Sequence, residues 1–128
     1  MTLRQKIGYW LPTIIWAIVI FSFSSGSTPA TSEIYWQDFI VKKSAHVFVY
    51  AVLAVLLYRS LRLTTQYSRS YLLLFTLTLT VLYAISDEFH QSLIPGRESR
   101  FRDIIIDAAG ALAGLKLTGS LFNRTIKM

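Results

Sequence analysis

Apolar residues in this chain gather in four long blocks rather than alternating with polar ones. The blocks cover residues 7–25, 44–61, 71–87 and 104–122. Each approaches the roughly 20 residues that an α-helix needs to cross about 30 Å of hydrocarbon, at a rise of about 1.5 Å per residue. Inside a bilayer the backbone finds no water to bond, so such a segment forms a helix. The pattern predicts an all-α, polytopic membrane protein, in which residues 1–128 form one domain, a bundle of four transmembrane helices.

The first block has a second interpretation, a cleaved signal peptide. Arg4 and Lys6 precede it and small residues follow it at 24–27, as in a signal sequence. Trp10 and Trp16 are bulky for the apolar core of such a peptide, and three more blocks follow in any case. A first membrane span is therefore the preferred interpretation.

The connection between the first two blocks, residues 26–41, is rich in aromatic side chains. Tyr35, Trp36 and Phe39 lie within it. Two interpretations stay open for this segment. One is a short helix lying in the headgroup region, and the other is an aromatic belt at the end of the second span.

Composition excludes several classes of function. The formal net charge of +6 would suggest nucleic-acid binding in a soluble protein. Here the basic residues flank apolar blocks, so topology control and anionic lipid headgroups explain them better, and no nucleic-acid partner is expected. The chain contains no cysteine, which excludes disulfides, a thiolate nucleophile and a thiolate metal site.

Lysine and arginine also predict the orientation. If the chain crosses four times, one side of the membrane receives both termini and the connection between the second and third blocks, with Arg4, Lys6, Arg59, Arg62, Arg69, Arg124 and Lys127. The other side receives Lys42, Lys43, Arg97, Arg100 and Arg102, together with all 7 Asp and Glu residues. Acidic residues count for little in the orientation rule, so the basic bias favours both termini in the cytoplasm.

Polar side chains on the acidic side recur at helical spacing. Lys43, His46 and Tyr50 are three and four residues apart, so they share one face of the second helix. In the fourth block Asp103 and Asp107 are also four residues apart. The same stripe continues through the GxxxG pair at 110 and 114, which allows close helix packing.

The third block adds three more polar residues and a turn. Glu88 and Gln91 are three residues apart, and Asp87 lies on the adjacent stripe. A Pro-Gly turn at 95–96 then ends in Arg97. Counted along the helices, Glu88, Asp107 and Tyr50 lie at similar depths, roughly 5–10 Å inside the membrane boundary. Ionisable groups at such depth normally face the bundle interior and a partner, which indicates a shared site.

A purely structural interpretation competes with this functional one. Buried polar networks often only fix helix packing, and this explanation fits His46, Glu88, Asp107 and Arg97. Tyr50 is equally explained as a packed aromatic residue whose hydroxyl has a partner. Both interpretations predict that the side chains converge.

Together these motifs resemble the VanZ-like family of bacterial membrane proteins, named for a member linked to resistance to the glycopeptide teicoplanin. The ordered set comprises Lys-Ser-Ala-His at 43–46 with Tyr50, Asp-Glu-Phe-His-Gln at 87–91, Pro-Gly-Arg at 95–97, and Asp103, Asp107, Gly110 and Gly114. The similarity covers about residues 22–117. The family often has an aspartate directly before the lysine, where this chain has Lys42, so a charge relay through that position is in doubt.

The resemblance implies a multi-pass inner-membrane protein of cell-envelope modification or teicoplanin-type glycopeptide resistance, and no particular reaction. We expect a polar pocket that opens to the outer face and accepts an anionic lipid-linked or amphipathic envelope molecule, such as a cell-wall precursor or a glycopeptide. The alternatives are a non-catalytic lipid or glycopeptide binder and an accessory subunit of a larger envelope complex. Whether the protein is an enzyme, and its oligomeric state, stay open.

Each candidate residue receives a role. Glu88 and His46 are the best acid–base pair, and Asp107 would orient His46 or bind a cation. Arg97, with Lys43, is suited to hold a phosphate or carboxylate. The remaining residues assigned to substrate binding are Tyr50, Asp87, Gln91 and Asp103.

We expect no cofactor and no metal from the sequence alone. There is no HExxH or equivalent spacing, and the chain has only 2 histidines. Glu88 and His90 are two residues apart and face opposite sides of a regular helix. Arg97 and Lys43 also offer the carboxylates another means of neutralisation.

Overall fold

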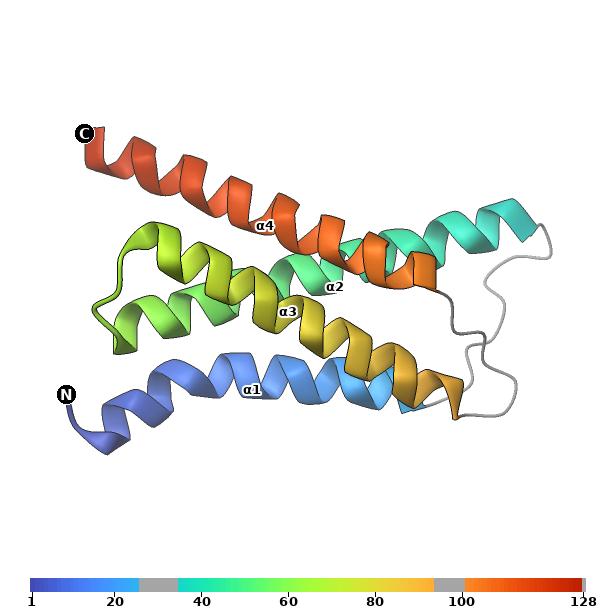
Figure 1. The fold of residues 1–128 in the computed structure, drawn as a ribbon, viewed down its shortest axis with the longest axis horizontal. Helices are drawn as coiled ribbons and strands as arrows, with labels where there is room; N and C mark the ends of the chain where they lie inside the picture. Colours follow the sequence, from blue (N-terminus) through green and yellow to red (C-terminus); the bar gives the residue numbers. More distant parts are fainter. Residues whose placement is uncertain (26–34, 94–100, 128) are drawn as a thin grey trace.

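The computed structural model describes residues 1–25, 35–93 and 101–127. Four helices account for nearly all of them: α1 (Leu3–Ser25), α2 (Tyr35–Thr64), α3 (Arg69–Ser92) and α4 (Phe101–Lys127). They lie lengthwise beside one another (Figure 1). No strand occurs in the described ranges, so the predicted all-α helical bundle is confirmed.

Three helices contain segments long and apolar enough to cross a membrane, and the chain is a membrane protein. The segments are Leu3–Phe23, Ile40–Thr64 and Arg69–Ser92. Large apolar side chains such as Ile14, Ile18 and Leu74 are exposed on the bundle surface, where a bilayer would cover them. The crossing by α4, and therefore the number of passes, stays a prediction.

Helix α2 begins earlier than the apolar block that predicted it. It starts at Tyr35, whereas the block starts at residue 44. Residues 35–41, expected as part of a connection, are thus the first two turns of α2. The rest of that connection, residues 26–34, lies outside the described residues.

The start of α1, the end of α4 and the short connection between α2 and α3 lie at the same end of the bundle (Figure 1). This is the end to which the orientation rule assigns the cytoplasm. Because the chain contains no cysteine, single cysteines can report on topology without background. We expect Tyr67→Cys to react with an impermeant maleimide only after the membrane is opened, and Ser27→Cys and Ser99→Cys to react in intact cells. Labelling of position 67 from outside would show the predicted orientation to be wrong.

Helix α2 is the centre of the bundle and contacts the other three helices. It approaches α4 closely at two glycines. A Cβ atom added to Gly110 would lie 2.6 Å from the carbonyl oxygen of Val47, and one added to Gly114 would lie 2.6 Å from that of Ala51. The GxxxG pair therefore lets the backbones approach, as predicted. This close packing fixes how α2 and α4 are aligned along their length, and therefore which of their side chains meet.

Helix α1 is attached to the bundle by polar side chains as well as by apolar packing. Trp16 donates from its indole nitrogen to the carbonyl oxygen of Val49 at 2.9 Å. The hydroxyl of Thr13 lies 2.6 Å from that of Ser60 and donates to the carbonyl oxygen of Leu56 at 3.0 Å. These contacts give the bulky tryptophan of α1 a structural role inside the bundle.

Candidate functional site

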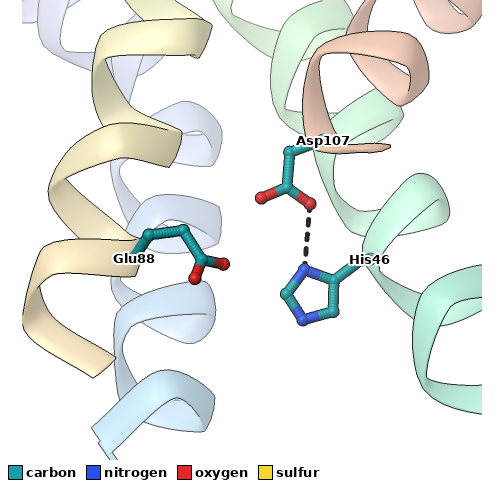
Figure 2. Close-up of side chains that lie close together, drawn as sticks. All are labelled: His46, Glu88 and Asp107. Carbon is teal, nitrogen blue, oxygen red and sulfur yellow. Dashed lines mark hydrogen bonds and ion pairs between the residues drawn. The ribbon is translucent and has the colours of Figure 1, made fainter. Parts of the chain in front are cut away.

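Three helices each contribute one ionisable side chain to a common point. His46 comes from α2, Glu88 from α3 and Asp107 from α4, and Figure 2 shows them turned toward one another. One nitrogen or oxygen atom of each lies within 4.8 Å of the others. Asp107 is completely buried and Glu88 is 3% exposed, while His46 is half-buried. We call these three residues the central triad.

A direct hydrogen bond holds His46 in place. Its Nδ1 atom lies 2.9 Å from Oδ1 of Asp107. When Asp107 is ionised and the ring is neutral, Nδ1 donates this hydrogen bond and Nε2 is left as an acceptor. Asp107 thus contacts the imidazole directly and can orient it, which is one of the two roles considered for it.

A second polar group adjoins the triad. The hydroxyl of Tyr50 donates to Oδ2 of Asp87 at 3.0 Å, and the amide of Gln91 donates to the same oxygen at 3.3 Å. All three side chains are buried. The ring of Tyr50 is nearly parallel to that of His46, with ring centres 6.4 Å apart. Asp87, Tyr50 and Gln91 therefore line the site beside His46.

Lys43 and Asp103 form an ion pair at the neighbouring turn of α2 and α4. Asp103 is 5% exposed and Lys43 is half-buried. The ammonium group thus neutralises a carboxylate of the protein itself. Any anionic ligand that Lys43 binds has to share it with Asp103.

Arg97, assigned to the same anionic group, lies outside the described residues. His90 is described, and its ring stacks on that of Phe21 with centres 4.4 Å apart. Glu88, two residues earlier, belongs to the triad instead. The two side chains thus have different surroundings, as the helical phase predicts.

Tyr83 is a member of this region that the sequence reasoning did not single out. Its hydroxyl donates to the carbonyl oxygen of Ala17 at 2.5 Å, and its ring centre lies 6.3 Å from that of Tyr50. The available signal was its four-residue spacing from Asp87, which places both on one face of α3. Tyr83 connects α1 to the wall of the site.

The triad also has the composition of a metal-binding group. One imidazole and two carboxylates are ligands that first-row divalent cations accept. Among the described residues, Oδ2 of Asp107 and Oδ1 of Asp87 have no hydrogen-bond partner. The site can therefore either transfer protons or hold a cation.

The chain matches a known protein family. The family model described as VanZ/LLP1 matches residues 8–122, nearly the whole chain. That range reaches into all four helices and includes all nine residues assigned to the site. No curated protein and no solved structure matches the chain.

Proposed function

The chain belongs to the VanZ/LLP1 family, a membrane-protein family linked to glycopeptide resistance, and from that premise we propose that it modifies or protects the bacterial cell envelope. In this proposal the protein acts on an anionic lipid-linked or amphipathic envelope molecule. The molecule enters from the outer face, at the end of the bundle opposite the termini. The apolar part of such a molecule stays in the bilayer while its polar part reaches the central triad.

The observation that carries this proposal is the convergence of His46, Glu88 and Asp107 from three helices. Ionisable side chains are costly at this depth, so their meeting at one point favours a functional site. With ligand atoms no more than 4.8 Å apart, a substrate atom between His46 and Glu88 comes within hydrogen-bond reach of both. His46 and Glu88 then act as the acid–base pair, and Asp107 is the positioning residue that orients His46.

The neighbouring residues supply the binding shell of the proposed site. Tyr50 and Gln91 fix the carboxylate of Asp87, which offers an acceptor toward hydroxyl or amine groups of a substrate. Lys43 and Asp103 stand beside it as a pair. Arg97 is retained as the guanidinium that binds the anionic group, a prediction from the sequence.

Glu88→Gln tests the proposal, because it keeps the shape of the side chain and removes the base. We expect the variant to lose glycopeptide resistance, or any other envelope phenotype that the wild-type protein confers on a susceptible host. Loss of an acid–base residue typically lowers a rate about 10²–10⁴-fold. His46→Asn should have the same effect. The measurement is survival in a teicoplanin dilution series, with protein abundance and thermal unfolding recorded in parallel.

Ser92→Ala is the matched control, since Ser92 is exposed and lies one turn beyond Glu88 on the same helix. It should behave like the wild type. If Glu88→Gln kept full resistance at normal abundance, Glu88 would not be the base. That result would favour the non-catalytic alternative, a lipid or glycopeptide binder or an accessory subunit. The pairs Lys43–Asp103 and Tyr50–Asp87 are also contacts that such a protein would use to hold its shape.

A further inference from the structure

The described part of the bundle buries several acidic side chains near the central triad. Four carboxylates are buried among the described side chains, those of Asp87, Glu88, Asp103 and Asp107. Lys43 neutralises Asp103, and His46 is the basic group that contacts Asp107. Buried carboxylates are tolerated where they are paired, protonated or bound to a metal.

One carboxylate oxygen of the triad is prepared for an additional ligand. Asp107 is completely buried, and its Oδ1 is used by His46 while its Oδ2 has no hydrogen-bond partner among the described residues. Figure 2 shows this second oxygen on the side of Asp107 that faces Glu88. A carboxylate oxygen that is removed from water and makes no hydrogen bond is stabilised by a proton or by a cation.

The spacing of the triad is close to that of a metal site. The ligand atoms lie within 4.8 Å of one another. Around a zinc ion with bonds of about 2.0–2.2 Å, they would lie roughly 3.5 Å apart. Binding of the ion therefore requires side-chain rotations that bring these ligand atoms closer together.

We propose that His46, Glu88 and Asp107 bind one divalent cation of the zinc or manganese class. Three protein ligands leave at least one coordination position open, as in catalytic rather than structural sites. In an acid-rich site the open position gives the anionic group of a substrate a positive partner. This role of the cation rests on the proposed function and makes His46 and Glu88 ligands instead of a free acid–base pair. Binding of the cation is measurable without the proposed function.

The inference revises the sequence-based expectation of a metal-free protein. That expectation relied on the absence of paired ligands in one helix, but here each ligand comes from a different helix. His90 is not needed, because its ring packs on Phe21 and His46 supplies the nitrogen. Lys43 pairs with Asp103, and Arg97 lies outside the described residues.

Metal content of the purified protein tests the proposal. The protein is extracted in mild detergent without chelator, purified through a tag that binds no metal, and assayed by elemental analysis. We expect close to one zinc or manganese ion per chain in the wild type. In His46→Ala and Asp107→Asn the affinity for the metal should fall at least about tenfold, so that these variants are purified without it. His90→Ala, which removes the other histidine, is the matched control and should retain the metal.

A second measurement covers variants that fail to fold. Wild-type protein stripped with chelator should gain thermal stability when zinc or manganese is added back, because a ligand that binds only the folded state stabilises it. Trace metal in the wild type, together with no stabilisation on adding either ion, would overturn the proposal. If resistance still depended on Glu88 in that case, the proposed function would stand without a cation. If instead the wild type contained the metal and Glu88→Gln kept full resistance, the acid–base role of Glu88 would be refuted and metal binding would stand.

Discussion

Gly114→Leu is expected to prevent the protein from accumulating in the membrane. Even the Cβ atom of a new side chain would lie 2.6 Å from the carbonyl oxygen of Ala51 and 3.0 Å from its Cα. The obstacle is backbone of α2, which cannot rotate away as a side chain can. Overpacking of a core costs about 1–3 kcal/mol and occasionally more, and a leucine here also forces apart the two helices that hold His46 and Asp107. The measurement is protein abundance in the membrane fraction, with thermal unfolding in detergent.

Substitutions at two other glycines serve as controls for Gly114→Leu. Gly8 has nothing within 4 Å of an added Cβ, so Gly8→Leu should leave abundance unchanged. At Gly119 the added Cβ would meet the end of the flexible Arg69 side chain at 2.6 Å, so Gly119→Ala should be mild. Wild-type abundance and unfolding of Gly114→Leu would mean that α2 and α4 do not pack through this glycine.

The second large effect is expected at the Lys43–Asp103 pair. Lys43→Met leaves the carboxylate of Asp103 buried without its ammonium partner. Removing one member of a buried ion pair typically costs about 3–5 kcal/mol, because the remaining charge is uncompensated. The variant should therefore unfold at markedly lower denaturant concentration or temperature in detergent.

The double variant Lys43→Met/Asp103→Leu separates this cause from loss of packing. Replacing both members removes the orphaned charge, and such replacements are often neutral or stabilising. We expect the double variant to recover most of the lost stability. If it were as unstable as Lys43→Met alone, the stabilising contacts of Lys43 would lie elsewhere than on Asp103.

The helices were predictable because apolar length is a direct physical requirement of the bilayer. The start of α2 was not, since Lys42, Lys43 and Gln37 interrupt the apolar pattern while the helix continues through them. The hydropathy pattern predicts which residues lie in the hydrocarbon core. It does not predict the residue at which the helical hydrogen bonds begin or end.

For the site, helical phase and depth correctly placed His46, Glu88 and Asp107 at one level, as the meeting of their ligand atoms shows. The individual partners did not follow from the sequence. That Lys43 meets Asp103 and Tyr50 meets Asp87 depends on how far one helix is shifted along another. The shift is set by close packing, such as that of Gly110 on Val47, and no periodicity within a single helix encodes it.

The attachment of α1 has a consequence for how this protein tolerates sequence change. Trp16, Thr13 and Tyr83 all donate to backbone carbonyl oxygens, those of Val49, Leu56 and Ala17. Every amino acid carries that acceptor, so these bonds restrict the donor position and leave the chemistry of the acceptor position free. Homologous chains can therefore exchange apolar residues at the acceptor positions without losing the bonds. Among them, the acceptor positions should vary while the donor positions keep a side chain that can donate.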